Sequence, residues 1–455
     1  MRRPITTVAL PLLMLCGQVH AELTQQLRWD IALSDGEQRL QKSRLTYQPQ
    51  WQTQAGTTRF TLIPRLALEP AGDVQGYVSG AGQGAEQRPA SYPRGDINLN
   101  GPLWWHAAAR AELAEAYADS DVNVLGQQWS LRSGKQQVAW GQADGFRVLD
   151  IINPQDLREF NLPDAEDYRI PLWMLNAQLT LNNDQSLQLL LIPDLTFNEQ
   201  ANADSPFAIT SPELAPQSGQ SPLPLPLPIN VQPVKRPAQN NPEVALRWSA
   251  FINGWDLSAS YFSFYHDNAV IVRRLNINNN QPTSINVQAQ YRRAQLLGVS
   301  GSNAFGSWVL RFEAAHISRS FFLRNDLTHD GIQQSPEWQQ VTGLDYQGIS
   351  NTLLSYQFYL SHINTYDPAV IRARNNIRHT LMLKHNLLND TLELRFFTLL
   401  NRDYNDGQNR AQITWQVNDQ WSLWGGADHF FGNRAGPFGQ FSDASRLVLG
   451  CEYSF

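Results

Sequence analysis

The last ten residues of the chain alternate strictly between a uniformly apolar face and a mixed face of polar, small and aliphatic side chains. The apolar face carries Leu447, Leu449, Cys451, Tyr453 and Phe455, and the other carries Arg446, Val448, Gly450, Glu452 and Ser454. A period of two over about ten residues is typical of a strand that crosses a membrane as part of a β-barrel. A soluble sheet rarely leaves such a strand at its edge, because an open apolar edge invites aggregation. The alternation therefore predicts a transmembrane β-strand at the C-terminus.

The same alternation recurs along the chain, interrupted by short turns and long connections. Asn253-Gly254, between two alternating runs, is a strong signal for a tight hairpin. Short turns are predicted near Gln54, Asp121, Asn183, Asn253, Phe305, Ser350, Asn389 and Asp419, and long connections over residues 70–103, 142–170, 196–242, 268–284 and 318–336. The pattern predicts an all-β protein: one antiparallel transmembrane barrel over residues 22–455, with long extracellular loops and both termini in the periplasm. About eighteen strands are expected, with about sixteen as the alternative.

Four tryptophans stand directly after predicted short turns, at equivalent positions in their strands. They are Trp129, Trp255, Trp308 and Trp421. An aromatic girdle at the membrane interface would place them there, because their rings are apolar and their N–H groups remain close to water. The alternative is that they pack in the core of a soluble protein.

Charged residues within the strands fall on the polar face, which must line the lumen. Arginine or lysine exposed to lipid costs about 2–4 kcal/mol at the midplane of the membrane. The candidate pore-lining residues are Arg110, Glu112, Arg132, Arg247, Arg311, Glu313, Arg378, Arg395 and Arg410. The basic excess among them predicts a lumen that favours anions. The alternative is that these arginines pair with acids across strands and brace a wide barrel, Arg311 with Glu313 and Arg395 with Glu393.

The N-terminus carries the pattern of a secretory signal peptide over residues 1–21. Arg2 and Arg3 precede an apolar run, and small residues at Val19 and Ala21 suit cleavage before Glu22. A lipoprotein signal using Cys16 is the alternative, but it would need a small residue in place of Leu15. Cleavage changes the formal net charge from −6 to −8 and leaves one cysteine, so no intrachain disulfide is expected. These facts also suit a soluble periplasmic protein, and the alternation of the strands decides against it.

The connection at residues 142–170 is rich in charges of both signs. Asn153 followed by Pro154 is a typical helix start, and a short helix is predicted over residues 154–160. We expect this loop to fold into the lumen and narrow it, with Arg147, Asp150, Asp156, Arg158 and Arg169 lining the constriction. The alternative is an outer loop that salt bridges fasten to the rim of the barrel.

This region also carries a family resemblance. A strand ends in Gln-x-Val-x-Trp-Gly, with Val138, Trp140 and Gly141, and runs into Asp-x-x-Asn-Pro-x-Asp, with Asp150, Asn153, Pro154 and Asp156, before Arg169 and Pro171. The chain thereby resembles an uncharacterised family of proteobacterial outer-membrane barrels, a domain of unknown function usually grouped with alginate-export-like porins. The resemblance implies a transport role beside an exporter. Tyr453 and Phe455 similarly resemble the C-terminal insertion signal that the barrel-assembly machinery recognises.

Other functional classes find little support in the sequence. No Gly-x-Ser-x-Gly elbow is present, and adjacent pairs such as Asp428-His429 face opposite ways in a strand, so no enzyme is predicted. No Cys/His cluster suggests a metal, and no cofactor is expected. An acidic secreted chain does not suit nucleic-acid binding. The Pro-Leu repeat at residues 221–229 predicts polyproline II, as a spacer or a lid.

The sequence thus predicts a channel in the outer membrane of a Gram-negative bacterium, for an anionic or amphipathic solute. Its expected partners are outer-membrane lipid, the barrel-assembly machinery, and a periplasmic or inner-membrane exporter. The runner-up is an uptake porin for hydrophobic compounds, with an apolar side opening past Phe262 and Phe264 on the inward face. The third alternative is a structural or assembly barrel whose lumen is plugged.

Overall fold

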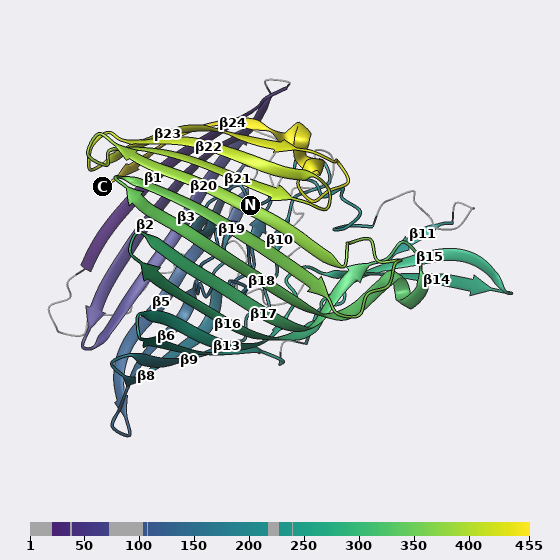
Figure 1. The fold of residues 1–455 in the computed structure, drawn as a ribbon, viewed down its shortest axis with the longest axis horizontal. Helices are drawn as coiled ribbons and strands as arrows, with labels where there is room; N and C mark the ends of the chain where they lie inside the picture. The colour runs from purple at the N-terminus through teal and green to yellow at the C-terminus, as the bar shows by residue number, and fades with distance from the viewer. Residues whose placement is uncertain (1–20, 37–38, 72–102, 107, 217–226, 239) are drawn as a thin grey trace, which may run out of the picture.

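The computed structural model describes residues 21–455 apart from residues 37–38, 72–102, 107, 217–226 and 239 (Figure 1). The predicted signal peptide therefore lies outside the described residues except at Ala21, as does most of the predicted polyproline segment. Among the described residues no helix is both long and apolar enough to cross a membrane.

Eighteen antiparallel strands close into a barrel, as the alternation predicts, and the alternative of sixteen is excluded. Each strand pairs with its neighbours along the chain, and β24 pairs with β1 to close the ring. The strands are β1 (Ala21–Ser34), β2 (Leu40–Ala55), β3 (Thr58–Ala71), β5 (Ala109–Val124), β6 (Gln127–Gln136), β8 (Leu172–Asn182), β9 (Gln185–Ile192), β12 (Glu243–Ile252), β13 (Trp255–Tyr265), β16 (Arg293–Phe305), β17 (Trp308–Leu323), β18 (Ile332–Ile349), β19 (Thr352–Ile363), β20 (Asn375–Leu387), β21 (Leu392–Asn401), β22 (Asp406–Gln416), β23 (Trp421–Phe431) and β24 (Arg446–Ser454).

The two faces of the strands differ as expected. On β24 the side chains of Leu447 and Leu449 are exposed on the outer face, whereas Arg446, on the opposite face of the strand, is buried inside. Trp308 and Trp421 each begin a strand and are exposed, and Trp255 begins β13. Because a closed barrel leaves no unpaired strand edge, all of its apolar outer surface can face lipid.

The short turns gather at the end of the barrel where the chain terminates. At Asn253-Gly254 both residues have positive φ, 51° and 84°, which confirms the predicted hairpin. The turn expected near Asp121 actually lies at Leu125-Gly126, because β5 continues to Val124. Phe455 closes this end: its N–H and C=O both bond to the backbone of Gln25.

Two of the long connections differ from the prediction. Strands β17 and β18 extend further than expected, so the connection between them is residues 324–331, with a short 3-10 turn η1 (Thr328–Gly331), rather than 318–336. The connection predicted at 268–284 is residues 266–292, and it contains a hairpin, β14 (Val270–Asn278) and β15 (Gln281–Gln290), to which β11 (Ile229–Val231) adds a third strand. This small sheet extends away from the barrel, to the right in Figure 1.

The helix predicted over residues 154–160 is wrong. Asp156 and Leu157 instead form a two-residue strand, β7, which pairs in parallel with β10 (Glu199–Gln200), and Phe160 has a positive φ of 54°. The one α-helix of the described residues is the single turn α1 (Ala165–Tyr168). The remaining short elements are β4 (Trp104–His106), paired with β5, and the 3-10 segment η2 (Gly439–Ala444).

Candidate functional site in the lumen

The connection between β6 and β8, residues 137–171, lies inside the barrel, and we call it the inner loop. Asn153 fastens its two ends together. The side-chain oxygen of Asn153 accepts the N–H of Val138 at 2.8 Å, and its amide donates to the carbonyl of Ile170 at 2.9 Å and that of Gln136 at 3.4 Å. The side chain is 1% exposed. Asn153 is therefore a clamp at the base of the loop and not the helix cap that the sequence suggested.

The other motif residues brace the inner loop from within. A Cβ atom at Gly141 would lie 2.8 Å from the Cβ of Asp150, so these two segments can pack only with glycine here. Asp150 pairs with Arg169 at 2.7 Å, and Arg147 donates to the carbonyls of Asp150 and Asn153, each at 2.6 Å. Arg147 and Asp150, which we expected at a constriction, thus hold the fold of the loop itself. Pro154 accepts the N–H of Ile170 through its carbonyl and adds to the clamp.

An apolar side of the inner loop packs against one half of the barrel wall. Phe146 stacks on Tyr359 of β19 with ring centroids 4.9 Å apart. Leu149 rests on Gly298 of β16, where a Cβ atom would come within 2.3 Å of its side chain. The buried cluster includes Val138, Trp140, Val148, Ile152 and Leu162 of the loop, and inward residues of the wall such as Leu190, Ile192, Phe262, Phe264, Leu296, Ala315 and Val341. The inner wall from β8 to β19 therefore carries an apolar cluster that the loop covers.

Polar side chains of the same wall hold the loop backbone. Glu313 of β17 accepts the N–H groups of Gln142 and, at 3.3 Å, of Leu149. Its neighbour Arg311 pairs with Asp144 of the loop and with Asp345 of β18, both at 2.9 Å. The cross-strand pair of Arg311 with Glu313, considered from the sequence, does not form.

Two more arginines of the wall contact aromatic rings. Arg247 of β12 lies 5.9 Å from the ring centroid of Trp140, whose Nε1 donates to Gln188 of β9 at 2.9 Å. Arg378 of β20 lies 5.8 Å from the ring of Tyr359. Arg132, also predicted to line the pore, pairs with Asp119 of the neighbouring strand at 2.6 Å. Together with Arg311 and Glu313, these three arginines do not line the cavity described next.

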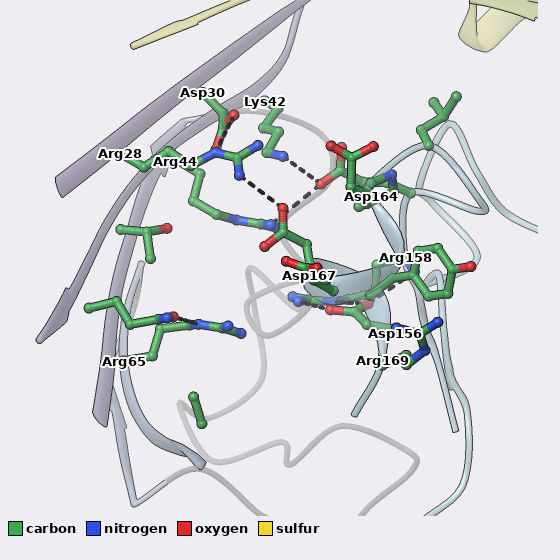
Figure 2. A pocket seen from close by; sticks show the side chains of 18 of the residues that line it. Arg28, Asp30, Lys42, Arg44, Arg65, Asp156, Arg158, Asp164, Asp167 and Arg169 are labelled. Carbon is green, nitrogen blue, oxygen red and sulfur yellow. Dashed lines mark hydrogen bonds and ion pairs between the residues drawn. The ribbon is translucent and has the colours of Figure 1, made fainter. Parts of the chain in front are cut away.

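A cavity of about 810 Å³ lies between the inner loop and the other half of the wall, formed by β1–β6 and β21–β24. The wall strands contribute nine basic residues: Arg28, Lys42, Arg44, Arg65, Arg110, Lys135, Arg395, Arg410 and Arg446. They contribute five acids: Asp30, Glu112, Glu115, Asp428 and Glu452. The inner loop contributes the opposite excess: Asp156, Glu159, Asp164, Glu166 and Asp167, against Arg158 and Arg169. Figure 2 shows Arg28, Lys42, Arg44 and Arg65 on the wall, facing the loop that carries Asp156, Asp164 and Asp167 across the cavity.

Glu159 is the deepest contact between loop and wall. Its carboxylate lies 2.9 Å from Lys42 Nζ, 2.7 Å from Arg446 Nη1 and 3.5 Å from Arg44 Nη1, and its side chain is 2% exposed. Arg446 also pairs with Asp428 of β23 at 2.9 Å. Although burial alone would favour the neutral acid, the positive charges of Lys42, Arg446 and Arg44 hold the pKa of Glu159 well below its usual range. Glu159 therefore carries its charge at neutral pH.

Two carboxylates of the loop form more exposed pairs at the edge of the cavity. Asp164 pairs with Arg395 of β21 and Asp167 with Arg28 of β1, each at 2.9 Å. The expected pair of Arg395 with Glu393 does not form, and Glu393 pairs instead with Lys384. Burial raises the pKa of Asp164, but the positive charge of Arg395 lowers it by more, so the pKa lies below its usual value.

Aromatic rings from two distant segments of the chain pack together with the inner loop. Phe160 packs against Phe438 and Phe441 at centroid distances of 5.6 and 4.7 Å, and Phe207 lies 5.8 Å from Phe441. Arg158 pairs with its neighbour Asp156 at 2.5 Å and lies 3.7 Å from Glu199 of β10. The inner loop is thus held to the connections at 193–242 and 432–445 as well as to the wall.

Sequence reasoning missed several cavity residues, including Lys42, Arg44, Arg65, Lys135 and Arg446. The alternation in β2, where Lys42 and Arg44 are separated by Ser43, was a usable signal for the first two. Arg110, Glu112, Arg395 and Arg410 were predicted to face the lumen and do line this cavity. Among the described residues no group of three or more potential ligands could hold a metal ion.

Comparison with family models identifies the chain. Residues 81–455 match the model described as "Protein of unknown function (DUF1302)". The chain belongs to the DUF1302 family. The match includes the inner loop with its Asn153 clamp and fifteen complete barrel strands. Comparison with curated proteins finds no match for this DUF1302 member.

The fold of this DUF1302 barrel also occurs in solved structures. The crystal structure of OccAB3 of Acinetobacter baumannii aligns with a TM-score of 0.50 at 10% identity, covering 96% of this chain and 99% of that chain. OccK9 (OpdG) of Pseudomonas aeruginosa aligns with a TM-score of 0.50 at 11% identity, covering 96% and 98%. At these identities the similarity is one of fold alone.

Proposed function

We propose that this protein is a channel of the bacterial outer membrane that carries an anionic or amphipathic solute. The observation that carries the proposal is the division of charge around the cavity: the barrel wall carries nine basic residues against five acids, whereas the inner loop and Glu199 together carry six acids against two basic residues. On the wall side of the passage, the excess of positive side chains favours anions over cations. A barrel fold shared with OccAB3 and OccK9, and apolar side chains on the outer face, support the placement in a membrane.

The inner loop would set the width of the passage. It fills the half of the lumen next to β8–β19 and leaves the basic half open to solute. The runner-up, an uptake porin for hydrophobic compounds, needs Phe262 and Phe264 accessible from inside. Their side chains are 1% and 6% exposed, stacked on each other and packed in the cluster with the loop, so they favour the first proposal.

Planar-bilayer recordings across a salt gradient test the channel. We expect a steady conductance with a reversal potential that indicates anion preference. Arg65→Gln should reduce that preference, because Arg65 lines the cavity from β3. Arg434→Gln is the matched control: it removes the same charge from an exposed ion pair with Asp443, which does not line the cavity. A silent barrel, or equal selectivity in both variants, would contradict the proposal and favour a plugged structural barrel.

We also propose that the barrel works with a periplasmic or inner-membrane exporter. Support comes from the resemblance of the Trp140–Pro171 motifs to proteobacterial barrels grouped with alginate-export-like porins. Insertion would depend on the barrel-assembly machinery, with Tyr453 and Phe455 as its signal, after removal of residues 1–21. In-cell crosslinking from the end of the barrel that bears the short turns should capture the exporter subunit, and crosslinks to the assembly machinery alone would contradict this part.

A further inference from the structure

The segment Pro163–Tyr168 of the inner loop, which we call the acidic turn, carries three carboxylates to the edge of the cavity. Asp164 and Asp167 each hold a wall arginine, Arg395 and Arg28, at 2.9 Å. Glu166, between them, lines the same cavity and makes no ion pair with the described residues. The acidic turn thus places two carboxylates against two guanidinium groups of the basic wall, which come from β21 and from β1, four strands further around the barrel.

The contacts of the acidic turn are of a different kind from those of Glu159. The side chains of Asp164 and Asp167 are 55% and 42% exposed, against 2% for Glu159. Exposed ion pairs contribute little net free energy, because water solvates the separated charges almost as well, whereas a buried charge that loses its partners is strongly destabilising. The loop is therefore anchored at Glu159 and Asn153, and its acidic turn can leave the wall while the anchor remains.

The guanidinium group of Arg28 is held in place by its neighbours on the wall. Arg28 lies 4.9 Å from the ring centroid of Trp424 and is bonded to Asp30, which together fix the plane of its guanidinium group. Each guanidinium group retains donors suited to the fork geometry of a carboxylate. Between them the wall offers the further cation Arg410 and the amide of Gln412, both in the lining of the cavity.

We propose that Arg28 and Arg395 are the two ends of a binding site for a solute with two or more carboxylate groups, and that Asp164 and Asp167 occupy this site as internal competitors when no solute is bound. The proposal deepens the proposed function, since it names the solute class of the same cavity. A solute with a single negative charge replaces only one internal contact, whereas a multiply charged one replaces both. The acidic turn therefore makes the site selective for multivalent anions.

Isothermal titration calorimetry of the purified barrel with citrate tests this site directly, and the measurement does not depend on whether the barrel conducts ions. Asp164→Asn with Asp167→Asn should bind citrate at least about tenfold more tightly than the wild type, because both competitors are gone. Glu166→Gln is the matched control, since it removes the same kind of charge from the same turn without freeing an arginine, and it should stay within about twofold. Equal affinities in the double variant and in Glu166→Gln would overturn the proposal.

A second variant separates the site from general charge effects. Arg28→Gln with Arg395→Gln should lose at least about tenfold in citrate affinity, with heat-modifiable mobility in gels confirming a folded barrel. Retained affinity in that folded variant would overturn the site. If the barrel does not conduct in bilayers but its variants show these changes in citrate affinity, the result contradicts the proposed channel and supports the binding site. A conducting, anion-preferring barrel with no difference between the variants contradicts the site and leaves the channel intact.

Discussion

At the scale of single residues, Glu159 is the most consequential side chain of the lumen. Its carboxylate forms ion pairs with three largely buried cations from β2 and β24, Lys42, Arg44 and Arg446. Glu159→Gln should destabilise the docked loop by about 3–5 kcal/mol, because the partners of a buried charge are left uncompensated. Protection of the loop amides against hydrogen exchange measures the loss. Asp443→Asn, in the exposed pair with Arg434, should leave this protection unchanged, because water solvates the separated charges of that pair. Similar protection in both variants would contradict this role.

The same carboxylate predicts how loop docking depends on pH. The pKa of Glu159 is lower in the folded protein than in the unfolded chain, so its stabilisation is fully present above the ordinary pKa of glutamate, about 4.3, and is lost as pH falls through the depressed folded value. Loop protection in the wild type should therefore be constant from about pH 8 to about pH 5 and fall only in stronger acid. A loss near neutral pH would indicate that another group controls docking.

Single residues also mark the limit of sequence reasoning here. Asn153-Pro154 has the local chemistry of a helix start, yet the Asn153 side chain bonds to Val138 and Ile170, each at least fifteen positions away. Asp156 and Leu157 likewise pair with Glu199 and Gln200. Contacts between distant segments outweighed the local preference for a helix, and such contacts cannot be predicted from the pattern of neighbouring residues. The alternation of strands, by contrast, is local, and it predicted the closed barrel and its strand number correctly.

At the scale of elements, the inner loop divides into an apolar part and a charged part. Deleting residues 150–169 removes the charged part but leaves Phe146 and Leu149, which pack on Tyr359 and Gly298. We expect a folded barrel with a single-channel conductance higher by about twofold or more, because the carboxylates that face the basic wall are gone. Unchanged conductance in a folded barrel would contradict the prediction that this segment narrows the passage.

The sequences of β9 and β13 indicate that one side of the inner wall is covered by other residues. At the end of β9 the residues Leu189–Ile192 are all apolar, and β13 ends in Tyr261-Phe262-Ser263-Phe264-Tyr265. Continuous apolar runs are typical of strands that are buried on both faces. The sequence therefore contained a signal that the lumen beside these strands is filled, but not the identity of the segment that fills it.

At the scale of the whole molecule, the barrel is closed by its last residues. The rings of Tyr453 and Phe455 stack at 5.1 Å, and Trp421 lies 4.8 Å from Tyr453, beside the backbone pair of Phe455 with Gln25. Tyr453→Ala with Phe455→Ala should lower the yield of membrane-inserted barrel by about tenfold if these rings are the insertion signal. Trp415→Ala, an exposed aromatic change on β22, is the control and should insert normally. Equal yields for the two variants, measured by heat-modifiable mobility, would contradict that role.

The two halves of the inner wall also differ in how freely they can change over evolutionary time. Substitutions in β8–β19 disturb the packing of the inner loop, so each must be matched by a change in Phe146, Leu149 or their neighbours. Substitutions at Arg28, Arg65 or Arg395 in the other half alter the cavity without touching that packing. The charge of the cavity can therefore change at a few wall positions of this barrel without a matching change in the loop that fills the other half.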